Sequence, residues 1–132
     1  VIPSNQLVLA LTSPESGERI RTIGFDATNL RGNDNGWTVR KHGTASEDNN
    51  NIVLIRLAEM YLIRAEARAQ LGRLTGANGA IADLNVLRSR AKASQFTTGS
   101  QADVLAAVER ERQYELAFEG HRWYDLVRTG RA

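Results

Sequence analysis

Three glutamates lie on the apolar face of a helix predicted over residues 100–119. With a helical step of about 100° per residue, Glu111, Glu115 and Glu119 point in the same directions as Val104 and Val108. Carboxylates at this spacing repel one another, and burial would drive their protonation unless cations pair with them. The pattern therefore predicts that arginines from other elements meet these glutamates.

The composition supplies such partners. The chain has fifteen arginines and two lysines, and the planar arginine fork suits paired hydrogen bonds to a carboxylate. A second acidic stripe, Glu59 and Glu66, has the same need because its members are seven residues apart on one helix face. We interpret these charges as ion pairs that fix the register of the helices, while the alternative is that the glutamates are general acids or bases. The candidate arginines are Arg56, Arg64, Arg88, Arg90 and Arg122.

Composition and motifs argue against several other classes of protein. The net charge is +2 and the chain has no cysteine, so we expect neither a disulfide framework nor a thiolate metal site. Acids lie near nearly every arginine, which does not fit a nucleic-acid surface. Glu119, His121 and Asp125 could be drawn as a metal site or catalytic triad, but they match no known ligand spacing, and we interpret His121 as a packed turn residue. We therefore predict no metal and no cofactor.

The sequence changes character near residue 50. Residues 1–50 contain both prolines and turn-rich stretches such as LRGNDNGW (30–37), and they are predicted to form a loop-rich irregular segment with short extended pieces at 6–11 and 37–42 but no sheet. Residues 51–132 are predicted to be α-helical, with helices over 52–72, 77–92, 100–119 and 121–129. The first of these is apolar over more than half its circumference, which predicts a central position, and Ser100 with Asp103 predicts a capping box.

The expected fold class is all-α: a tetratricopeptide-like helical hairpin plus two further helices, with a loop-rich amino-terminal segment. The hairpin is predicted from a helix rich in small residues, a Leu-Gly end, a short turn and a second helix. No apolar run is long enough to cross a membrane and no signal peptide is evident. The opening VIPSNQLVLAL lacks an initiator methionine, from which we expect a fragment or a processed chain.

Trp37 lies in a stretch of glycine, asparagine and aspartate. A tryptophan ring can stack on a sugar face while the neighbouring Asn35 and Asp34 bond to hydroxyl groups. The alternative is that Trp37 anchors the loop to the helices. These three residues are the predicted ligand contacts.

Three stretches of the chain resemble the successive signatures of the carboxy-terminal region of SusD/RagB-family proteins. They are IRLAEMYLIRAEARAQLG (55–72), LNVLRSRA (84–91) and ERQYELAFEGHRWYDLVRTG (111–130). The resemblance implies a non-enzymatic lipoprotein on the outer-membrane surface of Bacteroidetes, which binds an oligosaccharide or other nutrient and covers a SusC-like TonB-dependent transporter. Membrane association would come through a lipid anchor outside this chain.

The resemblance carries over no ligand-binding residue, because the family's ligand contacts lie mainly in variable loops. The charged positions in the matched stretches are expected to be structural salt bridges: Arg56, Glu59, Glu66, Arg88, Arg90, Glu111, Glu115, Glu119, Arg122 and Asp125.

Two other functions stay open from the sequence. A tetratricopeptide-like protein-protein interaction module would show an exposed apolar groove along the hairpin. A glycosidase would place two glutamates about 5 to 10 Å apart in an open cleft and would turn over an oligosaccharide.

Overall fold

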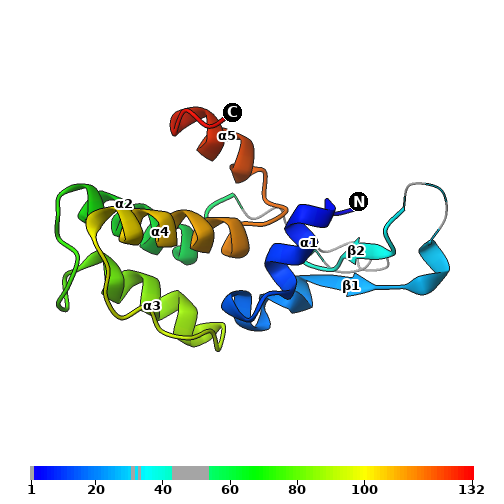
Figure 1. The fold of residues 1–132 in the computed structure, drawn as a ribbon, viewed down its shortest axis with the longest axis horizontal. Coiled ribbons are helices and arrows are strands. Elements are labelled where there is room, and N and C mark those ends of the chain that lie inside the picture. The colour runs from blue at the N-terminus through cyan, green and yellow to red at the C-terminus, as the bar shows by residue number, and fades with distance from the viewer. Residues whose placement is uncertain (1, 31, 33, 43–53) are drawn as a thin grey trace.

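The structure is a computed structural model that describes residues 2–30, 32, 34–42 and 54–132. Its carboxy-terminal part is helical, with α2 (Leu57–Gln70), α3 (Ala80–Arg90), α4 (Gln101–Glu115) and α5 (His121–Arg128). Helix α2 packs on both α3 and α4, whereas α5 stands away from the other helices (Figure 1). The predicted all-α fold class with a helical hairpin is confirmed.

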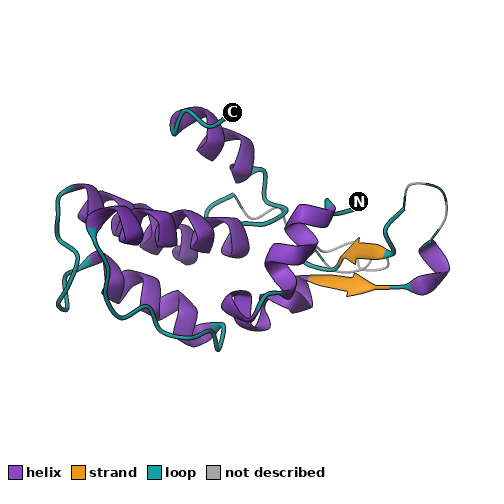
Figure 2. Ribbon diagram, in the orientation of Figure 1, coloured by secondary structure: helices purple, strands orange, loops and turns teal. Residues whose placement is uncertain are grey.

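The amino-terminal part has more regular structure than the sequence predicts. Helix α1 (Asn5–Thr12) is followed by two 3-10 helices, η1 (Pro14–Thr22) and η2 (Ala27–Asn29), and two short strands, β1 (Ile23–Phe25) and β2 (Trp37–Val39). The strands pair antiparallel with Phe25 opposite Trp37, and they lie at the opposite end of the molecule from the α2–α3 hairpin (Figure 2).

The main apolar core lies between α2, α3 and α4. Small side chains of α2 let the helix axes approach closely, and larger aliphatic side chains from α3 and α4 fill the space between them. Burial of each such large side chain contributes roughly 1.5–3 kcal/mol. The buried members are Ala58, Leu62, Ala65, Ala69, Ala80, Ile81, Leu84, Leu87, Val104, Ala107, Val108 and Leu116.

A second apolar cluster joins the two parts of the chain. Val8, Leu11 and Ile23 from the amino-terminal part pack with Tyr114 and Ala117 at the end of α4. The predicted division of the chain at residue 50 stays a prediction, and this cluster contains residues from both sides of it.

The contact between η1 and the end of α3 requires a glycine. Gly17 has φ of 60°, and a Cβ atom added there would lie 2.1 Å from the backbone oxygen of Ala91. Its neighbour Glu18 donates a backbone hydrogen bond to the same oxygen, at 2.7 Å. A side chain at position 17 would therefore push η1 away from α3.

Several predicted boundaries were wrong. Residues 6–11 form helix rather than an extended piece, because the Ser4 side chain accepts from the Leu7 backbone N–H and begins α1. A two-stranded sheet forms where none was predicted, although the extended piece at 37–42 is correct for its first three residues. The helix predicted from residue 52 begins at Leu57, and residues 52 and 53 lie outside the described part of the chain.

The helix predicted over 100–119 ends at Glu115, and Phe118 and Gly120 take left-handed conformations with φ of 66° and 80°. The capping box at Ser100 and Asp103 is confirmed. Helix α2 is central in that it contacts two helices, yet it leaves several large apolar side chains exposed: Leu57, Met60 and Ile63.

Candidate functional site

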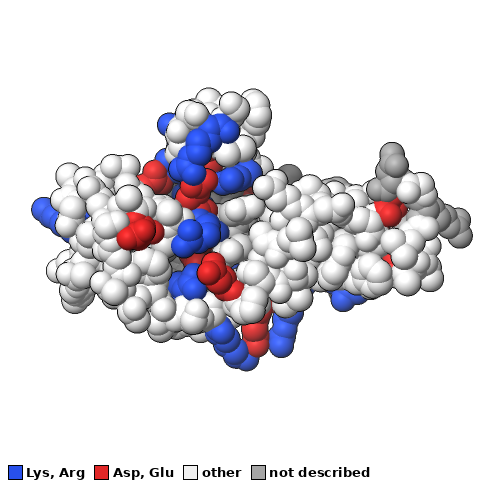
Figure 3. All heavy atoms as spheres, in the orientation of Figure 1, with Lys and Arg blue, Asp and Glu red and all other residues white. Residues whose placement is uncertain are grey.

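Charged side chains gather in a strip that runs from α5 across α4. On the face drawn in Figure 3, blue and red side chains alternate along this strip while the amino-terminal part is mostly uncharged. Charges buried without partners would cost several kcal/mol each, so each one needs an account. In the described part of the chain, the buried charged side chains are Arg19, Asp83, Arg88, Glu111, Arg112, Glu115 and Asp125.

Glu111 of α4 is fully buried. One carboxylate oxygen accepts from Arg19 of η1, and the other accepts from Nη1 of Arg88 of α3 at 3.0 Å. Burial raises the pKa of Glu111, even though the two guanidinium groups favour its charged form. The two arginines hold α4 against elements on either side of it.

Glu115 receives three arginines. Arg19 Nε donates to it at 2.9 Å, Arg56 Nη1 at 3.0 Å and Arg90 Nη2 at 2.5 Å. Burial alone would raise the pKa of Glu115, but the hydrogen bonds from Arg90 and Arg19, with the charge of Arg19 and the bond from Arg56, outweigh it and lower that pKa to about 2. Glu115 is therefore a carboxylate that holds no proton at neutral pH.

Two cations hold the end of α4. Lys41 Nζ donates to the backbone oxygens of Glu115 and Ala117 at 2.7 and 2.9 Å, and Arg56 Nη2 donates to the Glu115 oxygen at 2.9 Å. Carbonyls at a helix end need outside donors, and positive charge is favourable there. With these donors in place the helix ends one turn earlier than predicted.

Glu119 is in the turn after α4 and still reaches the same two cations. Arg56 donates to its two carboxylate oxygens at 3.0 and 2.7 Å, and Lys41 lies 2.5 Å from it. Burial opposes ionisation of Glu119, but the bonds from Arg56 and Lys41 prevail and lower its pKa. Burial lowers the pKa of Lys41, although Glu119 favours its charged form.

Helix α5 is attached to α2 and α4 by a second group of ion pairs. Asp125 accepts from Arg112 Nε at 2.8 Å and from Arg128 Nε at 2.9 Å. Arg128 also donates to both oxygens of Glu66, at 2.5 and 2.9 Å. Burial alone would raise the pKa of Asp125, but the bonds from Arg112 and Arg128 lower it.

The remaining predicted partners lie elsewhere than the three central glutamates. Arg122 pairs with Glu109 at 3.1 Å rather than with a residue of the stripe. Arg64 donates to Asp83, with 2.7 Å between Nη2 and Oδ1. Glu59 lies 3.6 Å from Nδ1 of His121.

Sequence reasoning missed Arg19 and Lys41. Both come from the segment that was predicted to be irregular, and they meet carboxylates that are 70 to 100 residues away in the chain. Helical periodicity shows that the glutamates need cations, but it gives no information about partners at such separations. The sequence feature that pointed to further cations was the number of glutamates on the apolar face of the helix predicted over residues 100–119.

The polar side chains predicted to contact ligand, Asn35 and Asp34, form hydrogen bonds with other groups of the chain. Asn35 donates to the backbone oxygen of Pro3 and accepts from the Trp37 backbone N–H, at 2.8 and 3.1 Å. Asp34 accepts from the Gly36 backbone N–H at 2.9 Å. Trp37 is partly buried against the second cluster, and its ring meets that of Phe25 edge to face at 5.3 Å.

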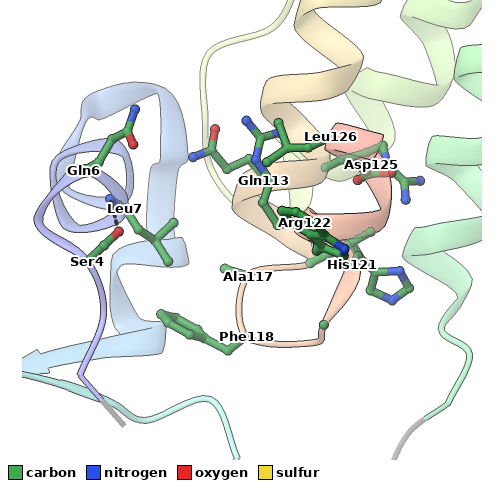
Figure 4. Close-up of a pocket in the computed structure, with 14 residues that line it drawn as sticks. Ser4, Gln6, Leu7, Gln113, Ala117, Phe118, His121, Arg122, Asp125 and Leu126 are labelled. Carbon is green, nitrogen blue, oxygen red and sulfur yellow. Dashed lines mark hydrogen bonds and ion pairs between the residues drawn. The ribbon is translucent and has the colours of Figure 1, made fainter. Parts of the chain in front are cut away.

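A cleft lies between α1 and the segment that links α4 to α5 (Figure 4). Its volume is about 570 Å³. Leu7 lines it from the α1 side, Phe118 from the turn, and Trp123 and Leu126 from α5. Gln113 extends from α4 toward α1. The lining of the cleft therefore mixes apolar side chains with polar ones, and the buried pair Arg112 and Asp125 is among the polar ones.

Glu119, His121 and Asp125, the set rejected above as a metal site or triad, have other partners in the structure. Glu119 pairs with Arg56 and Lys41, and Asp125 pairs with Arg112 of α4 and with Arg128 of its own helix. In residues 2–30, 32, 34–42 and 54–132, no group of three His, Cys, Asp or Glu side chains could hold a metal ion.

Comparison with known proteins tests the resemblance that was based on residues 55–72, 84–91 and 111–130. The model of the SusD family matches residues 24–132, which include the hairpin, α4, α5 and all members of the two ion-pair groups except Arg19. The chain belongs to the SusD family. The resemblance seen in the three sequence stretches is thereby confirmed.

Relatives of this SusD-family chain are much longer than the part it matches. SusD-like protein P38 of Formosa agariphila is 38% identical over 96 residues, which are 66% of this chain and 18% of that protein. SusD-like protein P25 of the same organism is 38% identical over 85 residues, 61% of this chain and 16% of that protein. A crystal structure of a SusD-like protein from Bacteroides fragilis matches with 30% identity and a TM-score of 0.62. The matched region is 72% of this chain and 20% of the chain in that structure.

None of the helices in the described part of this SusD-family chain is long and apolar enough to span a membrane.

Proposed function

We propose that this chain is part of a SusD-like protein that binds a glycan or another nutrient at the cell surface. We propose that this protein delivers the nutrient to a SusC-like TonB-dependent transporter in the outer membrane. The observation that carries the proposal is the family match over residues 24–132. Attachment to the membrane would come from a lipid anchor outside this chain.

The ion pairs support a structural role for the acidic stripe rather than hydrolysis. A glycosidase needs one carboxyl that gives up a proton and a second that attacks or activates water. Glu115 and Glu119 each accept hydrogen bonds from two or more cations, and their lowered pKa values leave no proton to donate. Their arginines hold α4 to α3, to the residue before α2 and to η1.

Trp37 is the residue that we propose for contact with a sugar. Its ring pairs with that of Phe25, which is half exposed, so the two rings form an aromatic patch on the short sheet. The side-chain amide of Asn35 and the carboxylate of Asp34 form hydrogen bonds within the chain. We propose that these groups position the tryptophan rather than bind hydroxyl groups directly.

Calorimetric titration of the chain with a panel of oligosaccharides tests this proposal. We expect heat of binding for at least one sugar, and its loss in Trp37→Ala. Trp123→Ala is the matched control because it removes the other tryptophan, which is far more exposed. Binding that survives Trp37→Ala would refute the role of Trp37, and an absence of heat with every sugar, from a folded sample, would refute ligand binding by this part of the protein.

A further inference from the structure

Helix α5 presents most of its apolar side chains to solvent, while the side chain that it buries against the protein is the carboxylate of Asp125. With a step of about 100° per residue, Trp123, Tyr124 and Val127 lie on one side of the helix, and they are 64%, 73% and 52% exposed. On the other side, Asp125 is the only buried side chain of the helix. A surface helix of a globular protein normally shows the reverse arrangement.

Ion pairs fix this orientation. Asp125 receives Arg112 and Arg128, and Arg128 also binds both oxygens of Glu66 on α2. Because the polar face of α5 supplies these contacts, rotation of the helix to bury its apolar face would break them. The outward position of Trp123 and Tyr124 is therefore set by the ion pairs beneath them.

The exposed face continues into the cleft beside α1. Trp123 lines this cleft together with Leu126, Leu7 and Phe118, which are labelled in Figure 4. We call the combined region the α5 apolar surface, and its members are Leu7, Phe118, Trp123, Tyr124, Leu126 and Val127.

We propose that an apolar segment from the rest of a SusD-like protein covers the α5 apolar surface. The chain matches only 18% and 16% of its relatives and 20% of the solved structure, so most of such a protein lies outside the match. This inference rests on family membership and does not depend on nutrient binding.

A second copy of the chain is a weaker fit to the same surface. The exposed parts of its three most exposed members, Trp123, Tyr124 and Val127, amount to roughly 400 Å², since an aromatic side chain buries 150–250 Å². The other three members, Leu7, Phe118 and Leu126, are already partly buried within the chain. Stable complexes bury about 800 Å² on each partner. A segment of the same polypeptide needs less area, because it does not lose the translational freedom that separate molecules lose.

A lipid surface also fits less well. Amphipathic helices that lie on membranes use free basic residues to bind anionic headgroups. Here the basic residues in and after α5 already have carboxylate partners: Arg122 and Arg131 pair with Glu109, and Arg128 pairs with Glu66 and Asp125.

Hydroxyl-radical footprinting read by mass spectrometry tests the proposal residue by residue. The 132-residue chain is compared with a chimera in which it replaces the matching region of SusD-like protein P38. We expect rapid oxidation of Trp123 and Tyr124 in the chain alone and a several-fold loss of oxidation in the chimera. Buried Tyr114 should be protected in both, which provides the internal control. Equal oxidation of Trp123 and Tyr124 in the two proteins would overturn the proposal.

The other occupants give different results in the chain alone. Protection that rises with protein concentration would identify a second copy, and protection on addition of phosphatidylglycerol vesicles would identify a lipid surface; either would overturn the proposal. A variant with Tyr124→Ser and Val127→Ser should keep the Tm of the chain, whereas the buried control Val104→Ser should lower it. A large fall in Tm for the double variant would show that α5 packs within the chain, and would also overturn the proposal.

Discussion

Removal of Arg19 should destabilise the protein far more than removal of another arginine that binds the same carboxylate. Arg19 is 6% exposed and pairs with Glu111 and Glu115, whereas Arg90 pairs with Glu115 and is 58% exposed. Breaking a buried ion pair by removal of one partner costs about 3 to 5 kcal/mol. An ion pair whose arginine is exposed contributes about 0 to 1 kcal/mol because water screens it. We therefore expect Arg19→Met to cost several times more than Arg90→Met.

The magnitude follows from what each variant leaves behind. Without Arg19, Glu111 keeps Arg88 as its remaining cation among the residues that the structure describes. Without Arg90, Glu115 keeps Arg19 and Arg56. A domain of this size has on the order of 5–15 kcal/mol of stability, so a loss of this size should be measurable.

Urea unfolding followed by far-ultraviolet circular dichroism gives the free energies. The slope m should be the same in the wild type and both variants, so that the midpoints report stability. Arg19→Met combined with Glu111→Gln should recover part of the loss, because the amide does not leave a buried charge behind. Equal costs for Arg19→Met and Arg90→Met would refute the reasoning that burial makes the difference.

Three further results are expected. The pKa of Glu115 is lowered from 4.5 to about 2, so the ionised carboxylate stabilises the fold above pH 4.5 and this stabilisation is lost as the pH falls toward 2. The loss in the free energy of unfolding is about 3 kcal/mol. The variant Glu115→Gln should therefore show a smaller fall in urea midpoint between pH 5 and 2.5 than the wild type. Gly17→Ala should cost more than 1 kcal/mol, because position 17 has positive φ and the new Cβ would contact the Ala91 oxygen; Gly72→Ala, also at positive φ but with open space around it, is the matched control. Ser100→Ala should cost about 1 kcal/mol through loss of the capping box, whereas Ser100→Asp should retain most of the stability in thermal melts.

Local patterns predicted the helices whose ends carry local signals. The capping box fixed the start of α4, and Gly72 and Gly130, in left-handed conformations, mark where α2 and α5 end. The helix α1 was missed because its apolar run of five residues, 7–11, fits a short strand as well as a helix. The side chain of Ser4, which accepts a hydrogen bond from the Leu7 backbone, was the signal that could have found it.

The sequence predicted that the buried glutamates need cationic partners, but it identified only some of the residues that supply them. Arg88 and Arg90 lie on the neighbouring helix and were on the predicted list of partners. Arg19 and Lys41 arrive through tertiary contacts, and Lys41 donates to the carbonyls of Glu115 and Ala117 where α4 ends. A prediction based on helical period alone therefore extends α4 too far and places Glu119 on it.

The position of Arg19 decides whether the helices can be studied by themselves. A shortened protein that began after residue 22 would keep α2, α3 and α4, and their aliphatic core would be complete. It would nevertheless lose one of the two cations that neutralise Glu111, together with one of three that bind Glu115. The independence of the helical part is thus limited by charge rather than by hydrophobic packing.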